Sequence, residues 1–214
     1  MPHFQKDARF FTKDWTITLP SHPDPNLKFI RLTPTDTAAF IRFASAAAAS
    51  PPTPVPKSTE TPPAALIPGA RMQTQYAESH TLHHALDVYI SLSGTFVGWG
   101  GVYAITAPNE KPSVANIGIK LLPEIRGKGL GKTLMRVLLR LSNELEVDVI
   151  EAGTMRWNSG MRGVARSVGL VETDEVKEVR GQGVVAEVMF KDIERERWRG
   201  LDMVVEFQDQ GVSE

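Results

Sequence analysis

Residues 114–145 read VANIGIKLLPEIRGKGLGKTLMRVLLRLSNEL, and three different patterns follow one another in this stretch. Residues 114–122 are rich in alanine, valine, isoleucine and leucine, which predicts a buried strand. Residues 123–132 are a glycine-rich and basic loop. A helix is predicted after the loop, because apolar residues recur at steps of three and four and form one wide stripe. The stripe consists of Leu130, Leu134, Val137, Leu138, Leu141 and Leu145.

The loop between the strand and the helix is suited to an anion. Gly127, Gly129 and Gly131 carry no side chain where the chain turns, so consecutive backbone N–H groups can approach a ligand closely. The start of the helix adds unpaired N–H groups and the positive end of the helix dipole. Three basic residues accompany the glycines, namely Arg126, Lys128 and Lys132. The sequence therefore predicts a site for a phosphate or a diphosphate.

Three known sequence patterns of nucleotide-binding loops are similar to this one. The dinucleotide fingerprint Gly-x-Gly-x-x-Gly does not fit, because the glycines alternate. A P-loop ends as Gly131-Lys132-Thr133 does here, but Arg126 stands where its first glycine is required. The pattern Arg/Gln-x-x-Gly-x-Gly/Ala is matched completely by residues 126–131. In this the chain resembles the GNAT superfamily of acyl-CoA-dependent N-acyltransferases, in which such a loop holds the diphosphate of coenzyme A. The alternative is a glycine-rich turn that only packs a helix on a sheet.

A second block of sequence adds to the resemblance. Residues 150–152, Asn158 and the pair Gly169-Leu170 are similar to the strand, the asparagine and the Gly-Phe helix ending of GNAT enzymes, with leucine in place of phenylalanine. They resemble most the branch that acetylates protein N-termini, including ribosomal-protein alanine acetyltransferases. In that branch the asparagine contacts the pantetheine arm of the cofactor, and Asn158 is the matching position. Asn158 is also a candidate N-cap of the following helix, and the two roles are compatible.

The resemblance implies acetyl-CoA as the co-substrate and no metal. It also implies that the backbone at the end of the strand before the loop contacts the pantetheine and the thioester. The cofactor-binding residues expected in this way are Leu121, Leu122, Arg126, Gly127, Lys128, Gly129, Leu130, Gly131, Lys132 and Asn158.

The catalytic acid and base are not apparent from the resemblance. Many GNAT enzymes carry a tyrosine at the position of Ala165, and others carry a glutamate near the position of Asn116. Neither residue present here can take the role. Four other residues are candidates, namely Glu151, Glu78, His84 and Tyr103. His80 and His84 share a helical face, but the sequence supplies no third ligand at a defined spacing, so no metal site is predicted.

The composition narrows the classes of partner. The chain has 214 residues and a hydrophobic content of 42%. Its formal net charge is −1, so its overall charge does not favour binding to nucleic acid or to an anionic membrane surface. The absence of cysteine excludes disulfides and thiolate nucleophiles. The opening residues lack the apolar core of a signal peptide, and no apolar run is long enough to span a bilayer. We expect a soluble protein that is cytoplasmic or nuclear and not secreted, as a monomer or a homodimer.

The predicted fold is α/β (α+β), a GNAT fold with a mixed sheet of about six to seven strands and about four helices. We expect an N-terminal extension over residues 1–26 with a possible extra strand, an acetyltransferase domain over residues 27–198, and a tail over residues 199–214 that adds a strand or meets a second subunit. A Pro- and Ala-rich insertion over residues 45–68 is expected to be solvated or to act as a lid. Three local features are also predicted: a helix capped by Thr35 or Asp36, a helix over residues 72–85, and a strand over residues 171–179.

Three functions follow from these observations. The first is an N-acetyltransferase that passes an acetyl group from acetyl-CoA to a primary amine, such as a protein N-terminus, an amino acid or a small amine, by direct attack. The second is a non-catalytic GNAT-fold module that binds acyl-CoA or a partner. The third is a P-loop nucleotidase, for which the loop is only a near match.

Overall fold

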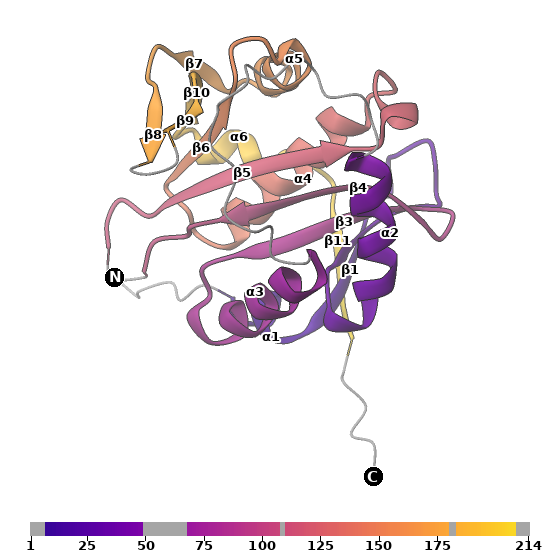
Figure 1. Cartoon of the computed structure of the whole chain (residues 1–214). Helices are drawn as coiled ribbons and strands as arrows, with labels where there is room; N and C mark the ends of the chain where they lie inside the picture. Colours follow the sequence, from indigo (N-terminus) through magenta and orange to yellow (C-terminus); the bar gives the residue numbers. More distant parts are fainter. Residues whose placement is uncertain (1–6, 49–67, 108–109, 180–182, 209–214) are drawn as a thin grey trace.

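The structure of the chain is a computed structural model that describes residues 7–48, 68–107, 110–179 and 183–208. A nine-stranded sheet crosses the molecule in the order β11-β1-β2-β3-β4-β5-β6-β10-β7, and β8 and β9 form a separate pair (Figure 1). The strands are β1 (Asp14–Thr18), β2 (Leu27–Arg31), β3 (Leu86–Leu92), β4 (Thr95–Tyr103), β5 (Val114–Leu121), β6 (Val149–Thr154), β7 (Val171–Thr173), β8 (Lys177–Val179), β9 (Gly183–Ala186), β10 (Val188–Asp192) and β11 (Val204–Gln208). The helices are α1 (Arg9–Thr12), α2 (Thr37–Ala48), α3 (Pro68–Leu82), α4 (Leu130–Glu144), α5 (Ser159–Ser167) and α6 (Arg195–Trp198), with short 3-10 turns at Pro34–Asp36 and Pro123–Ile125.

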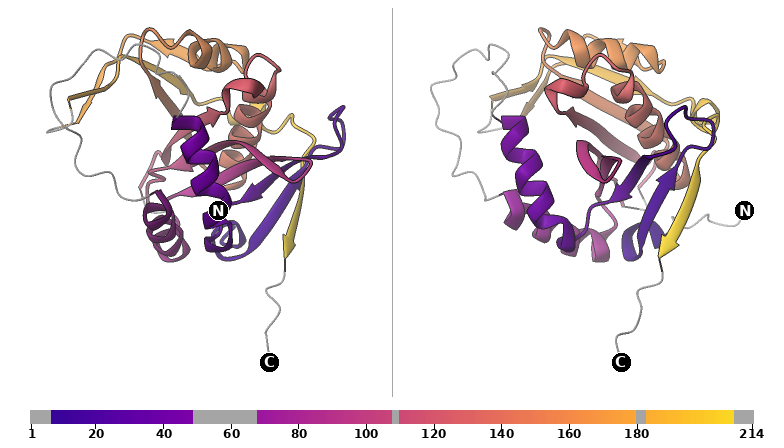
Figure 2. Two further views of the ribbon diagram at one scale, coloured as in Figure 1. Left: turned by 45° about the vertical axis from the view of Figure 1, so that its right-hand side comes forward. Right: turned by 90° about the vertical axis from the view of Figure 1, so that its right-hand side faces the viewer.

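Helices cover both faces of the large sheet. Along β4, a side chain at Gly100 would meet Leu134 and Leu138 of α4, whereas the neighbouring Trp99 lies near Phe40 of α2, with ring centroids 6.4 Å apart. Successive residues of a strand point to opposite faces, so α2 and α4 lie on opposite sides of the sheet. We call these sides the α2 face and the α4 face. Helix α3 lies on the α2 face beside α2 (Figure 2).

The larger core lies on the α4 face. The apolar stripe predicted for α4 is buried along its whole length, from Leu130 at 9% exposure to Leu145 at 0%. It packs on strand residues of the sheet such as Val102 and Ile117. Each such side chain that leaves water contributes about 1.5–3 kcal/mol, so this helix is fixed firmly behind β5. The loop that precedes α4 is thereby held at the end of β5, in the interior of the sheet.

The predicted fold class is confirmed, but the sheet has more strands than the six to seven expected. One additional strand is β1, which pairs with β2 on one side and with β11 on the other. The alternating residues of the tail therefore form strand β11 at the sheet edge, which is the first of the two roles expected for the tail. Neighbouring strands of the described sheet run antiparallel except for β5 and β6, which run parallel.

The structure departs from two local predictions. The capping box belongs to the 3-10 turn at Pro34–Asp36 that leads into α2: Thr33 is its N-cap, and Asp36 accepts a hydrogen bond from the Thr33 amide at 3.0 Å. The strand expected over residues 171–179 is divided, because β7 pairs with β10 whereas β8 turns away to pair with β9. The helix expected over residues 72–85 is present as α3.

Most of the Pro- and Ala-rich insertion lies outside the described residues, since α2 ends at Ala48 and the next described residue is Pro68. Among the helices that are described, none combines the length and the apolar character needed to cross a membrane.

Candidate active site

Strands β5 and β6 separate along their length, and this separation is the centre of the candidate site. The two strands pair from Val114 to Asn116 of β5, whereas β5 continues to Leu121 along its other neighbour, β4. The Leu122 amide donates to the Val97 carbonyl at 3.1 Å and so extends the ladder with β4. Hydrogen-bonding groups alternate along an antiparallel strand, so the backbone groups of Ile119 and Leu121 point away from β4. They face the opening between β5 and β6.

The glycine-rich loop follows directly at the end of β5. Gly127 and Gly129 adopt φ values of +76° and +84°, a left-handed conformation that favours glycine. A side chain added at either position would have no heavy atom within 4 Å, so the outer surface of the loop is open. Gly129 is the N-cap of α4 and offers no side-chain cap. The amides of residues 127–132 have no acceptor outside the helix in the described part of the chain, which is the arrangement that suits an anion.

Arg126 attaches the loop to the end of β5. Its guanidinium donates two hydrogen bonds to the Leu121 carbonyl, at 3.2 Å from Nε and 3.1 Å from Nη2. The side chain therefore turns back toward the strand, while Lys128 and Lys132 are exposed on the outer side of the loop. Three of the expected cofactor residues are buried, namely Leu122, Leu130 and Gly131, and the Leu122 amide donates to the sheet.

Gly131 brings three elements together behind the loop. A side chain there would lie 3.2 Å from Val164 of α5 and 3.4 Å from Leu121 of β5. The contact with Val164 is tighter than an ordinary one, so a side chain at this position would require small shifts where α4, α5 and β5 meet. The two alternatives considered for the glycines thus apply to different residues: Gly131 packs the helix, whereas Gly127 and Gly129 shape the open loop.

Asn158 lies on the other side of the opening, just after β6. Its Oδ1 accepts a hydrogen bond from the Met161 amide at 3.1 Å, and its Nδ2 donates to Thr154 Oγ1 at 3.0 Å. The residue is therefore the N-cap of α5, and it also ties the helix start to the end of β6. Asn158 therefore follows the strand that borders the opening on the side opposite β5.

A basic pocket of about 160 Å³ lies beside the loop, between α4, α5 and α6. Lys132 and Arg136 line it from successive turns of α4, and Arg197 lines it from α6. Arg197 also forms an ion pair with the buried carboxylate of Asp192 at 2.7 Å. Sequence reasoning did not identify Arg136 or Arg197. The spacing of four residues between Lys132 and Arg136 was the available signal, because it places both on one face of the helix.

The four candidates for an acid or base do not come together. Glu78 and His84 lie on and just after α3, with their side chains 3.9 Å apart. The Tyr103 hydroxyl on β4 donates to Asp87 Oδ1 at 2.8 Å. Glu151 lies on β6, opposite Asn116 of β5. No group of three metal-ligating side chains is found among the residues that the structure describes.

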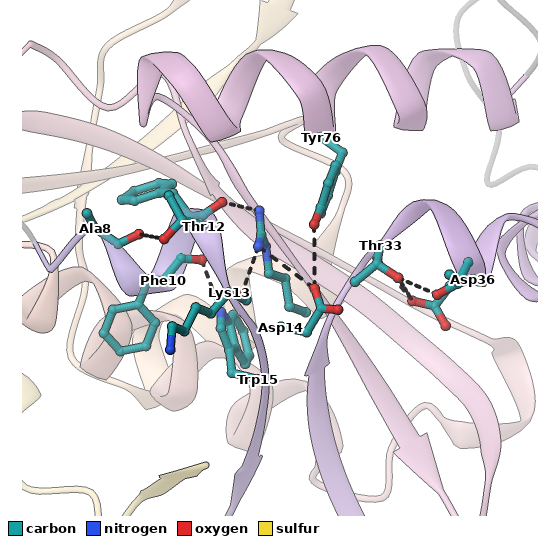
Figure 3. Close-up of polar contacts among 12 residues, drawn as sticks. Ala8, Phe10, Thr12, Lys13, Asp14, Trp15, Thr33, Asp36 and Tyr76 are labelled. Atoms are coloured by element: carbon teal, nitrogen blue, oxygen red, sulfur yellow. Dashed lines mark hydrogen bonds and ion pairs between the residues drawn. The ribbon is translucent and has the colours of Figure 1, made fainter. Parts of the chain in front are cut away.

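A separate cluster of polar contacts surrounds Arg31 on the α2 face, beside α3 (Figure 3). Arg31 at the end of β2 has a side chain only 2% exposed, and it donates to the carbonyls of Lys13, at 2.8 Å, and Phe11. The Tyr76 ring of α3 lies 4.4 Å from its guanidinium carbon. Burial lowers the pKa of Arg31. Nothing in the sequence indicated this cluster, which fixes α3 against the sheet.

Comparison with known proteins agrees with this geometry. A family model described as an acetyltransferase (GNAT) domain matches residues 26–171. The comparison with curated protein sequences gave no match.

Solved structures of the same fold are similar at low sequence identity. The ribosomal-protein-S5-alanine acetyltransferase of Vibrio fischeri has a TM-score of 0.63 at 15% identity and covers 78% of this chain and 93% of its own. Mycobacterium smegmatis RimJ in complex with CoA-disulfide has a TM-score of 0.60 at 17% identity and covers 88% and 90%. A chimera of the Vibrio cholerae spermidine N-acetyltransferase SpeG with hSSAT has a TM-score of 0.59 at 16% identity and covers 82% and 99%.

The family model covers more than half of the chain, and it confirms the family and the enzyme class expected from the loop at residues 126–131. The match sets the P-loop nucleotidase aside. The chain belongs to the GNAT family of acetyltransferases.

Proposed function

We propose that this protein transfers an acetyl group from acetyl-CoA to a primary amine. The observation that carries the proposal is the separation of β5 from β6, which directs the backbone groups of Ile119 and Leu121 into an opening directly before the glycine-rich loop. An extended ligand with amide groups, such as pantetheine, can hydrogen-bond to the backbone groups of Ile119 and to the Leu121 amide as an added strand would, whereas the Leu121 carbonyl already accepts from Arg126. The thioester is then held beside β5.

The rest of the cofactor is assigned to the loop and to the basic pocket. The diphosphate accepts hydrogen bonds from the amides of residues 127–131, next to the positive end of α4. Coenzyme A carries a further phosphate on its adenosine, and Lys132 and Arg136 offer two cations for it within one pocket. Asn158 and the start of α5 form the other wall of the cofactor site.

The chemistry needs little covalent participation from the protein. The amine attacks the thioester carbonyl directly, and the Ile119 amide is placed to donate a hydrogen bond to the oxyanion that forms. Alignment of the two substrates lowers the barrier further. An alkyl ammonium has a reference pKa of about 10.4, so a proton must leave the nitrogen before or during the attack.

The proposed acceptor is a primary amine, either a protein N-terminus or a small amine. Support for this range comes from the similar structures, which include an enzyme named for a ribosomal-protein alanine and one named for spermidine. The α2 face is the side from which the acceptor approaches, because α4 and its core fill the opposite side of β5.

A second candidate function is acyl-CoA binding without turnover. It is favoured by Ala165, which stands where many GNAT enzymes have a catalytic tyrosine and which is fully buried in the core. Asn116 likewise cannot act as a base. Binding and turnover therefore have to be measured separately.

The loop can be tested with two glycine variants that impose the same strain. Gly129→Glu places a carboxylate where the diphosphate is proposed to bind, at a residue with φ of +84°. Gly94→Glu is the matched control, since Gly94 has φ of +81°, an equally open surround and a position in the β3–β4 turn. We expect Gly129→Glu to weaken acetyl-CoA binding about 100-fold or more, roughly 2.7 kcal/mol, and Gly94→Glu to leave it unchanged in calorimetry.

The release of free CoA with a panel of amines then separates the two functions. An N-acetyltransferase releases CoA with at least one amine, whereas a binding module does not. No heat with acetyl-CoA at millimolar concentration would contradict both, and equal effects of the two glycine variants would contradict the assignment of the loop.

A further inference from the structure

Glu151 lies where β5 and β6 begin to separate. It is paired with Asn116, and beyond this pair β5 is paired with β4 and no longer with β6. Asn116 is also paired with Tyr103 of β4, and Glu151 is also paired with Lys191 of β10. The four residues therefore form a row across neighbouring strands. Paired residues share a face of the sheet. The row lies on the α2 face, because Tyr103 is four positions from Trp99 on β4 and an even separation places both on one face.

A lysine holds the Glu151 carboxylate in this row. Lys191 Nζ lies 3.4 Å from Glu151 Oε1 and 2.8 Å from Glu175 Oε2, so it is shared by two carboxylates. The hydrogen bond with Glu175 raises the pKa of Lys191 above its ordinary value, which keeps the cation in place. On the other side, Lys177 of β8 approaches Asn116 Oδ1 at 3.5 Å. The Glu151 side chain keeps 21% of its surface exposed, so water can reach it.

Glu151 lies too far from the proposed position of the thioester for direct contact. Ile119, whose amide is proposed to hold the thioester oxygen, lies three residues beyond Asn116, or about 10 Å along the strand. A glutamate side chain does not span this distance, so a proton transfer from the amine to Glu151 requires water between them. Glu151 is also on the face from which the acceptor amine approaches.

We propose that Glu151 is the general base of the acetyl transfer, acting through water, with Lys191 as its positioning residue. This inference rests on the proposed function. The amine nitrogen forms a bond with the thioester carbonyl carbon, and the carbon–sulfur bond breaks. The ammonium passes one proton through water to the Glu151 carboxylate and from there to solvent, which frees the amine for attack. The nitrogen loses a second proton to solvent as the tetrahedral intermediate collapses, and the departing CoA thiolate takes up one proton, so the reaction releases one proton overall.

The other candidates are less well placed for this role. Glu78 lies on α3 and His84 lies between α3 and β3, and the Tyr76 ring of α3 is 4.4 Å from the guanidinium carbon of Arg31 at the end of β2. The Tyr103 hydroxyl donates its hydrogen to Asp87, which lies on β3, one strand further from the opening than β4. Among the four, Glu151 is the carboxylate on a strand that borders the opening itself.

The test measures kcat, KM and acetyl-CoA affinity for Glu151→Gln. The probes are spermidine, a peptide that begins with alanine, and water, whose attack on acetyl-CoA needs a base in the same way. We expect kcat to fall about 100-fold or more on every probe that the natural chain uses, while acetyl-CoA affinity in calorimetry stays within about twofold. Glu151→Asp should retain an intermediate kcat, since it keeps the carboxylate and shortens its reach.

Glu144→Gln is the matched control, because Glu144 is a half-exposed carboxylate in an ion pair with Arg140 at the far end of α4. It should leave kcat unchanged. A Glu151→Gln chain that turns over within about threefold of the natural rate on all probes overturns the role of Glu151 and leaves the transferase intact. A natural chain that binds acetyl-CoA and never releases CoA overturns the transferase and Glu151 together. Loss of acetyl-CoA affinity in Glu151→Gln overturns the inference in favour of a structural role.

Discussion

Arg31 illustrates how one buried charge can organise the surroundings of a site that it does not touch. Its guanidinium donates to two main-chain carbonyls, lies 4.0 Å from Asp14 and faces the Tyr76 ring. A buried cation is costly unless its donors are satisfied, and here they are met by α1, β1 and α3 together. The residue thus joins the N-terminal segment to the helix that covers the α2 face.

Replacing Arg31 should therefore destabilise the whole protein. Arg31→Met keeps much of the side-chain volume but leaves the carbonyls of Phe11 and Lys13 without their donor. We expect the free energy of unfolding, measured in urea, to fall by about 3 kcal/mol. Arg42→Met, at an exposed position of α2, is the control and should change it by less than about 0.5 kcal/mol. A loss confined to acetyl-CoA binding, with stability unchanged, would contradict this structural role.

The structural roles of some residues could be predicted from the sequence, whereas those of others could not. The cap at Asn158 was among the roles predicted, because an asparagine before an apolar helical pattern is a local signal. Arg31 was not predicted, since its acceptors are main-chain carbonyls about twenty residues away and a basic residue at a strand end resembles a solvated one. The pairing of Glu151 with Asn116 was equally hidden, because parallel strands are joined by a long crossover.

At the scale of elements, the strand, loop and helix of residues 114–145 are local in sequence and were predicted closely. Period-two and period-3.6 patterns, glycines and an apolar stripe all agree over this stretch. The segment 171–179 was predicted as one strand because its pattern is continuous. It divides because β7 and β8 have different partners, and which partner a strand meets is decided by the tertiary structure.

The basic pocket on α4 leads to a prediction about the phosphate on the adenosine of the cofactor. If Lys132 and Arg136 bind that phosphate, CoA should bind more tightly than 3′-dephospho-CoA, and the double variant Lys132→Gln/Arg136→Gln should lose most of this preference. We expect the variant to bind CoA about tenfold more weakly and dephospho-CoA almost unchanged in calorimetry.

Arg140→Gln serves as the control on the same helix, since its guanidinium is paired with Glu144 at 2.6 Å and lies one turn beyond the pocket. It should keep the natural preference. An equal loss of affinity for both ligands in the double variant would place the phosphate elsewhere.

For the whole molecule, the two ends of the chain complete the sheet at the edge away from the cofactor loop. β1 and β11 pair over five residues, and Phe207 packs its ring on Phe10 with centroids 5.3 Å apart, beneath the Arg9 guanidinium. The sequence predicted alternating segments at both ends. It did not predict that they pair, because their contacts join residues nearly two hundred positions apart.

Removing the Phe207 ring tests whether this edge is a structural addition that is independent of the site. Phe207→Ala should lower the free energy of unfolding by about 2–3 kcal/mol, since the ring is only partly buried and full burial would give more. Acetyl-CoA affinity should remain within about twofold, because four strands separate β11 from β5 in the sheet. Val204→Ala, whose side chain is 42% exposed on the same strand, is the control and should have little effect on either quantity. If Phe207→Ala instead weakened acetyl-CoA binding as strongly as it weakened folding, the two edges of the sheet would be coupled, and the tail would have to be counted as part of the site.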